Sequence, residues 1–548
     1  MHNANLTYLL HQLERLNTIG VALSAERDNR RLLEMILLGA KEITNADGGT
    51  LYTVTDDKQL KFEIMSNKTL NISMGGTTGK EITFLPLPLY LADGSPNLTT
   101  VAAYATLNDK TVNIENAYEA LNFDFSGTRK FDEKTGYHSQ SFLTIPMKNH
   151  EAEVIGVLQL INAIDPETKK IIPFSVSNQS LVESLASQAA VAMTNHNLIE
   201  GLKGLFESFV ELIAEAIDQK SPYTGGHCRR VPELTMMLGQ AAIDVKTGPL
   251  QDFTLNDQEF YELKIAGWLH DCGKVITPES VMDKPTKLSA IFDRITLIDQ
   301  RFELLKKQAE CNKLNKIIEL MQSEKSADVV QKNLTEIDRH FSEFIQRCDA
   351  DRDFLRKSNI GSELMAPEDQ QRVRDLAAIA IVDESGEEKT FLSQDEVYNL
   401  NITRGTLTAE ERQIINNHIV VTINMLESLP YPKGLKRVPE YAGGHHERMD
   451  GKGYPRGLTR EQMSIPARVM GIADIFEALT SKDRPYKKAK TLSESLFILG
   501  KMKIDNHIDP DLFDLFVREK IYLKYALQFL EPEQIDEVDE SKIPGYTL

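Results

Sequence analysis

The sequence predicts a multidomain protein in which an α+β domain, with a central antiparallel sheet flanked by helices, precedes an all-α region with a helical insertion. The chain has 548 residues, and a single hydrophobic core stops growing at roughly 250–300 residues. Strand-like and helical patterns are mixed early in the chain, whereas the rest is mainly helical with Gly/Pro-rich interruptions. We expect an N-terminal domain at 1–174, a linker helix at 175–220, an all-α domain at 205–530 with an insertion at 289–403, and an acidic tail at 531–548.

The N-terminal domain is expected to begin with helices and to continue with strands. Apolar residues three and four positions apart make residues 1–45 helical. The turn signal Asp47-Gly48-Gly49 leads into a strand at 50–54, and strand-like runs recur up to 152–162. Helices around an interrupted set of strands indicate an α+β domain.

Residues 175–220 read as one long helix without an internal proline. Apolar residues follow alternating steps of three and four when Gln188 and Asn195 are allowed on the same seam, which is a coiled-coil pattern. The seam consists of Leu181, Leu185, Ala192, Ile199, Leu202, Phe206, Phe209 and Ile213. We expect a parallel homodimer through this helix. A single amphipathic connector that packs on its own domain is the alternative.

The charged stretch between Leu288 and Thr403 looks inserted into one helix connection. After it, Thr408 and Glu411 form a capping box, so the helix that carries His418 should start there. The acidic tail at 531–548 is expected to be a loose end.

Composition limits the partners of the protein. The formal net charge is −19, so the surface should repel nucleic acid and anionic membranes. The sequence contains neither a signal peptide nor an apolar run of the roughly 18 residues that a membrane span needs. The four cysteines form no CxxC pair, which fits a reducing compartment. We expect a soluble, cytoplasmic protein.

Histidines and carboxylates form a candidate metal site in the C-terminal region. Five of the 12 histidines lie in four short clusters, and two of them are adjacent at His445-His446. Neutral imidazoles with carboxylates are the usual ligands of zinc, iron or manganese, and one Asp can bridge two ions. Adjacent histidines can serve one site only at a helix end or between packed helices. The candidate ligands are His227, His270, Asp271, His418, His445, His446 and Asp474.

Two motifs carry a resemblance to a known family. Residues 270–274, HDCGK, match the HDxGK signature of the HD phosphohydrolases, and residues 445–455 match HHExxDGxGYP without a gap. Together they resemble the HD-GYP branch of metal-dependent phosphodiesterases of cyclic dinucleotides. The resemblance covers about Leu205 to Val517, apart from the insertion.

The resemblance implies a site residue by residue. One divalent ion would be bound by His227, His270, Asp271 and Asp474, and the other by Asp271, His418, His445 and His446. Lys274 would contact a phosphate oxygen or protonate the leaving oxygen, Arg484 and Lys487 would hold phosphates, and Gly453 and Tyr454 belong to a loop near the ligand. Tyr223 stands where some members have a glutamate for a third metal, so two ions, iron or manganese, are expected.

The reaction implied by this resemblance is hydrolysis of a 3′,5′-linked cyclic dinucleotide. Cyclic di-GMP, opened to linear pGpG and then to GMP in a second cut, is the default substrate, and 3′,3′-cyclic GMP-AMP is an alternative. A mononucleotidase of HD type and a catalytically silent receptor or adaptor are the rival functions.

The N-terminal domain resembles a GAF sensor through residues 47–52, 129–137 and 154–162. Residues 129–133, RKFDE, are close to the NKFDE motif of cyclic-nucleotide-binding GAF domains, and the resemblance implies a structural pair between Lys130 and Asp132. A nucleotide, another small ligand and dimerisation alone remain possible roles. None of the cysteines precedes Cys228, which excludes a bilin attached to this domain.

Overall fold

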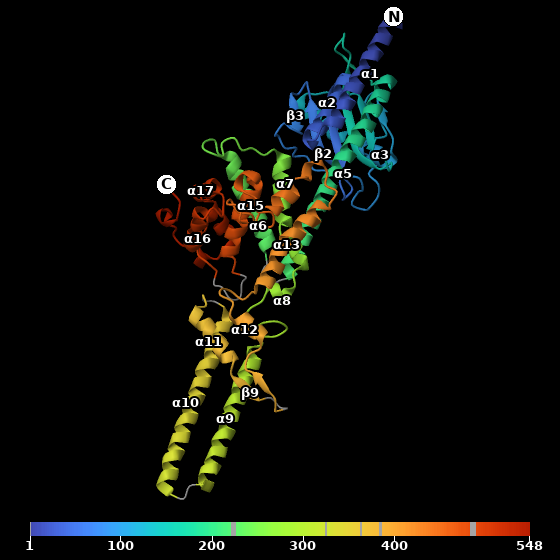
Figure 1. The fold of residues 1–548 in the computed structure, drawn as a ribbon. Coiled ribbons are helices and arrows are strands. Elements are labelled where there is room, and N and C mark those ends of the chain that lie inside the picture. Colours follow the sequence, from blue (N-terminus) through green and yellow to red (C-terminus); the bar gives the residue numbers. More distant parts are fainter. Residues whose placement is uncertain are drawn as a thin grey trace. The chain divides into compact units, whose positions relative to one another are not determined.

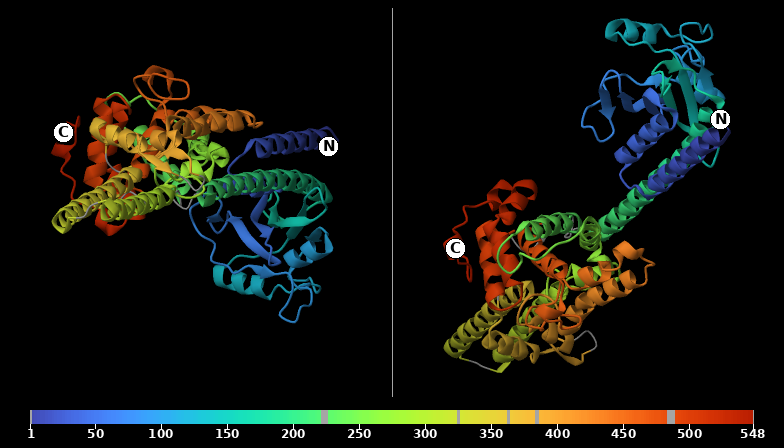
Figure 2. Two further views of the ribbon diagram at one scale, coloured as in Figure 1. Left: turned by 60° about the horizontal axis from the view of Figure 1, so that its bottom comes forward. Right: turned by 90° about the horizontal axis from the view of Figure 1, so that it is seen from above.

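The computed structural model describes residues 2–220, 226–323, 326–361, 364–382, 386–482 and 489–547. The chain divides into two compact units, residues 1–205 and residues 206–548, and Figures 1 and 2 show their elements. The first unit is a mixed α/β domain and the second is mainly helical. None of the helices in the described residues has the length and apolarity to cross a bilayer.

The first unit contains the predicted antiparallel sheet flanked by helices. Two helices, α1 (His2–Ala25) and α2 (Asn29–Thr44), precede the sheet, and α3 (Val101–Asn108) and α4 (Ser126–Thr135) lie within its connections. The main strand order is β3-β2-β1-β7-β6-β5, with β4 beside β2 and β8 beside β7, and every pair is antiparallel. The strands are β1 (Ala46–Val54), β2 (Gln59–Asn67), β3 (Ile72–Gly75), β4 (Leu87–Pro88), β5 (Val112–Ile114), β6 (Phe142–Lys148), β7 (Val154–Ile164) and β8 (Ile171–Ile172).

The prediction of a turn at Asp47-Gly48-Gly49 is wrong, because strand β1 already begins at Ala46. A side chain at Gly49 would place its Cβ 2.8 Å from Leu37 of α2. The glycine therefore allows α2 to pack closely on the central strand, and it is not a turn residue.

Helix α5 (Val176–Lys220) is the predicted long helix, but its seam divides into two parts. Leu181 and Leu185 are buried in the core of the first unit with residues of α1 and α2. Gln188 packs against Gly20 of α1, where an added Cβ would meet its side chain. The N-terminal part of the seam is therefore used within the domain, as in the connector alternative.

The second unit packs helices around two apolar cores. Its main helices outside the insertion are α6 (His227–Asp244), α7 (Asp257–Leu269), α8 (Glu279–Met282), α13 (Ala409–Glu427), α14 (Val438–Gly443), α15 (Ile465–Thr480), α16 (Leu492–Ile504), α17 (Pro510–Arg518) and α18 (Ile521–Phe529), with the 3₁₀ helix η1 (Cys272–Ile276). The capping box of Thr408 and Glu411 starts α13, as predicted.

The insertion is mainly helical, as expected, and has a core of its own at its base. Its elements are α9 (Ile295–Ser323), α10 (Ala327–Ile360), α11 (Pro367–Ala377), α12 (Gln394–Leu400) and a small hairpin of β9 (Ala380–Val382) and β10 (Glu388–Thr390). The long helices α9 and α10 lie side by side (Figure 1).

Two buried lysines join the start of the insertion to its end. Lys284 Nζ is 2.8 Å from Glu411 Oε1 at the start of α13. Lys287 Nζ donates to the carbonyl oxygens of Leu400 and Ile402, at 2.9 and 2.7 Å. Burial lowers the pKa of Lys287 to about 8.

The expectation of a loose acidic tail is wrong. It contains the 3₁₀ helices η4 (Pro532–Gln534) and η5 (Glu540–Lys542). Ile543 is buried in the core that includes Leu499, and the backbone N–H of Ser493 donates to Asp536 at 3.0 Å. Apolar contacts of Ile543 and the capping contact of Asp536 thus attach the tail to α16.

The expected pair between Lys130 and Asp132 is not formed in the described residues. Both lie on α4, and residues two apart on a helix do not face each other. Lys130 is exposed, whereas Asp132 is buried and accepts hydrogen bonds from Tyr118 Oη (2.7 Å) and from the Ser139 N–H (2.7 Å) and Oγ (2.8 Å). Asp132 therefore ties α4 to the segment before β6.

We predict that Asp132→Ala lowers the free energy of unfolding of the first unit by about 2–4 kcal/mol, because it leaves buried donors without an acceptor. Lys130→Ala is the matched control and should change it by less than about 0.5 kcal/mol. Calorimetry of the full chain resolves the two cases. Equal effects of the two substitutions would contradict the assignment.

Candidate metal centre

The structure brings the seven predicted ligands together from separate segments. His227 is the first residue of α6, His270 and Asp271 follow α7, and His418 lies in α13. His445 and His446 follow the end of α14, the helix-end position that adjacent histidines require, and Asp474 lies in α15. All except the partly exposed His446 are buried.

Asp271 lies at the centre of the cluster. Its Oδ2 is 3.3 Å from Nε2 of both His227 and His270, and its Oδ1 is 3.3 Å from His418 Nε2. The Oδ2 oxygen thus faces His227 and His270, and the Oδ1 oxygen faces His418.

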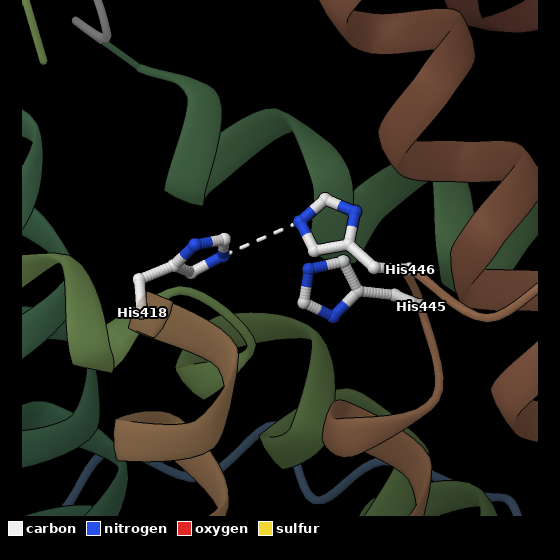
Figure 3. A group of neighbouring side chains, drawn as sticks. All are labelled: His418, His445 and His446. Atoms are coloured by element: carbon white, nitrogen blue, oxygen red, sulfur yellow. Dashed lines mark hydrogen bonds between the residues drawn. The ribbon is translucent and has the colours of Figure 1, made fainter. Parts of the chain in front are cut away.

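The remaining ligands extend these two groups. On one side, Asp474 Oδ1 is 3.2 Å from His227 Nε2, and the Nε2 atoms of His227 and His270 are 3.3 Å apart. On the other side, His446 Nε2 and His418 Nε2 are 3.3 Å apart, with the His445 ring beside them (Figure 3). Within each group of three, the ligand atoms lie within 4.8 Å of one another. The groups are His418, His445 and His446 on one side, and His227, His270 and Asp474 on the other.

Backbone carbonyls set the tautomers of three histidines. Nδ1 donates from His270 to Gly267 (2.7 Å), from His418 to Ile415 (2.6 Å) and from His445 to Ala442 (2.6 Å). Since a carbonyl oxygen only accepts, the proton is on Nδ1 and the Nε2 lone pair points into the cluster. His445 Nε2 is buried without a hydrogen-bond partner. This donor set fits a divalent metal.

Burial and neighbouring charges favour neutral imidazoles at His445 and His446 and an ionised carboxylate at Asp271. Burial lowers the pKa of His446 to about 4 and, with His446 nearby, places that of His445 well below its usual value. Burial alone would raise the pKa of Asp271, but Lys274 and His270 hold it well below its ordinary range. These are the protonation states in which such groups bind metals.

Lys274 lies beside the bridging carboxylate. Its Nζ is 2.6 Å from Asp271 Oδ2. The preceding Gly273 allows η1 to approach α13 closely, because an added Cβ would lie 2.0 Å from the carbonyl oxygen of His418. The HDxGK spacing thus places a cation at the site and brings His418 next to it.

The loop after His446 covers one side of the cluster. Tyr454 stacks on His446, with ring centroids 4.8 Å apart, and burial raises the pKa of its hydroxyl to about 12. A Cβ at Gly453 would lie 2.4 Å from Glu447 Cα, and Gly451 has a φ of 74°. Glu447 is buried and accepts the backbone N–H groups of Arg456 and Leu458, at 2.8 and 2.9 Å. Both glycines are therefore needed, Gly453 for close approach and Gly451 for its conformation.

Sequence reasoning missed Glu477. It is buried, follows Asp474 by one turn of α15, and accepts a hydrogen bond from His227 Nδ1. Arg230 donates from Nε to its other oxygen at 2.7 Å. Burial alone would lower the pKa of His227, but Glu477, Asp271 and Asp474 raise it well above its usual value. Its spacing of three from Asp474 places it on the same face of α15, but this spacing does not reveal the contact with His227.

Three residues of the sequence interpretation lie outside the described residues. They are Tyr223, Arg484 and Lys487.

Family models match both of the domains that the motifs predict. Residues 28–193 match the family model of the GAF domain, and residues 391–512 match a family model of the HD domain. The HD match contains His418, His445, His446 and Asp474. The chain thus carries a GAF domain followed by an HD domain, as the motifs predicted.

Curated relatives match shorter stretches of the chain. A 3′3′-cGAMP-specific phosphodiesterase of Vibrio cholerae is 44% identical over 85 residues, which cover 16% of this chain and 20% of that protein. A cyclic di-GMP phosphodiesterase of Pseudomonas aeruginosa is 36% identical over 137 residues, covering 25% and 32%. One of Thermotoga maritima is 41% identical over 126 residues, covering 21% and 34%. The chain therefore spans about a third or less of the length of these relatives.

Among solved structures, the GAF domain of an Acinetobacter phosphoenolpyruvate-protein phosphotransferase is 16% identical, covers 35% of this chain and 98% of that chain, and has a TM-score of 0.26.

We predict that Glu477→Gln lowers the affinity for Mn²⁺ about ten-fold or more, because a neutral amide orients His227 but does not supply the charge of the carboxylate. Mn²⁺ titration followed by electron paramagnetic resonance measures the change. The control is Glu233→Gln, on the exposed face of α6. Wild-type affinity in Glu477→Gln would refute the role of this residue.

Proposed function

We propose that this chain is a metal-dependent phosphodiesterase that hydrolyses a bacterial 3′,5′-linked cyclic dinucleotide under the control of its GAF domain. The observation that carries the proposal is the position of Asp271, whose Oδ2 faces His227 and His270 while its Oδ1 faces His418. This is the arrangement expected of a carboxylate that bridges two ions. The names of the relatives supply the substrate class.

The proposal assigns two ions, iron or manganese, to the two groups of ligands. The first site consists of His227, His270, Asp271 and Asp474, and the second of Asp271, His418, His445 and His446. Mixed imidazole and carboxylate ligands suit these metals. When bound, two such cations supply a nucleophile from water at neutral pH and neutralise charge on the phosphate.

The protein residues bind and orient the phosphodiester. Lys274, held at Asp271, is close enough to the cluster to contact a phosphate oxygen or to protonate the leaving oxygen. Tyr454 and Gly453 form the loop beside His446, against which part of the nucleotide would lie. We propose that Arg484 and Lys487 bind the phosphate groups of the substrate.

Cyclic di-GMP, cut to linear pGpG and in a second step to GMP, is the first candidate substrate. Cyclic GMP-AMP is the second, and the 44% identity to a 3′3′-cGAMP-specific enzyme favours it. The full set of ligands together with Lys274 supports hydrolysis over a silent receptor.

We further propose that the chain forms a parallel homodimer through the C-terminal part of the α5 seam. Ile199, Leu202 and Phe209 are 63%, 65% and 55% exposed. Their steps of three and seven fit a and d positions, and the neighbouring Leu198, Leu205 and Leu212 widen the stripe at heptad spacing. Since a helix of a second copy offers the same spacing, self-association would bury this stripe.

The first test incubates purified chain with Mn²⁺ or, without air, Fe²⁺, and with each dinucleotide separately. We expect release of the linear product, seen by chromatography. Asp271→Asn should lose both bound metal and turnover, whereas Lys274→Gln should retain metal and lose kcat about 100-fold. Metal-loaded protein that hydrolyses neither substrate would overturn the proposal.

The dimer is tested by sedimentation equilibrium. A dimer is expected for the wild type, and a monomer for Leu202→Asp combined with Phe209→Asp, because charges on the seam would be buried. Glu211→Gln, on the opposite face of the heptad, should remain dimeric. A monomeric wild type at micromolar concentration would refute the assignment.

A further inference from the structure

The last turn of α5, residues 217–220, contacts two of the segments that form the metal cluster. Val210, Ala214 and Ile217 line one face of the helix and are buried with Leu269 of α7 and Cys272 of η1. This face fixes the helix in the HD domain, and Asp218 and Lys220, which follow Ile217, reach the cluster segments.

Asp218 supplies the N-terminal cap of α6. Gly226, the N-cap residue, has no side chain to do so. The carboxylate of Asp218 is buried and accepts the backbone N–H of Gly226 at 3.0 Å and that of Cys228 at 3.2 Å. These two residues flank His227. A carboxylate at a helix N-terminus accepts hydrogen bonds from free N–H groups and interacts favourably with the helix dipole. Asp218 therefore fixes the backbone from which His227 projects.

Lys220 supplies the matching contact at η1. Its Nζ donates to the carbonyl oxygen of Lys274 at 3.1 Å and to that of Val275. A cation at the carboxyl end of a helix is favourable, and here it fixes the backbone of Lys274. The side chain of Lys274 in turn contacts Asp271.

We propose that Asp218 and Lys220 are positioning residues, and that through them the last turn of α5 sets the geometry of the metal site. Asp218 positions His227 and Lys220 positions Lys274. Because α5 starts in the GAF domain, a shift or rotation of this helix would change the positions of His227 and Lys274 together. Helix shifts of about 1–2 Å are a usual form of such regulation. The catalytic part of this inference rests on the proposed hydrolase function.

The Asp218 contact is tested by Mn²⁺ affinity of the full chain. We expect Asp218→Asn to bind Mn²⁺ about ten-fold more weakly and Asp218→Ala more weakly still, because His227 is a ligand. Gln219→Ala, an exposed neighbour, should keep wild-type affinity. Leu512→Ala destabilises the same unit through the core and should lower Tm without this loss of affinity. Wild-type affinity in both Asp218 variants would overturn the proposal.

The Lys220 contact is tested by kinetics. We expect Lys220→Met to lower kcat about ten-fold with Mn²⁺ affinity retained, because a displacement of about 1 Å at a reacting group is costly. Lys220→Arg keeps donors and should restore most of kcat. An unchanged kcat in Lys220→Met would refute this half of the proposal. If the wild type hydrolyses neither dinucleotide, the proposed function fails, but the Mn²⁺ measurements on Asp218 still decide whether α5 sets the site.

Discussion

The HD domain depends on keeping Asp271 ionised although it is buried. A buried carboxylate is strongly unfavourable unless charged or hydrogen-bonding groups compensate for its lost hydration. Lys274 provides this compensation together with His227, whose pKa is raised well above its usual value. His270, which follows α7, and His418 of α13 approach the same carboxylate, so these segments have to meet at one point. The apolar clusters around them hold the segments there. The same convergence directs imidazole lone pairs toward one another, which is unfavourable without a cation between them.

The ligands could be predicted from the sequence because they lie in contiguous motifs with unusual residue types, such as HDxGK and HHExxDGxGYP. Glu477, Asp218 and Lys220 could not be identified in this way. Each acts through a partner distant in the sequence, and each is a common surface residue type whose burial depends on tertiary packing. Residues that support ligands are therefore visible only after the helices are packed.

The fold shows the same limit. Long periodic patterns predicted α5 correctly, and a capping box predicted the start of α13. The Gly48-Gly49 pair predicts a turn, which is wrong. Gly49 is needed because Leu37 of helix α2 packs closely against it, and the local sequence does not show this contact. The composition of the acidic tail predicts a loose end, because charged residues outnumber the few apolar residues, such as Ile543, that attach it to the core. The heptad pattern of α5 did not reveal that part of the seam is buried within its own domain.

The lysines at the base of the insertion have a consequence for how the protein tolerates change. Lys284 and Lys287 bind the segment that returns to α13, so the two ends of the insertion are held together at its base. The entropy of closing a loop grows only slowly with its length. A change in the length of the α9 and α10 hairpin beyond this base would therefore have little effect on the helices that carry the metal cluster, which makes this position a permissive one for added segments.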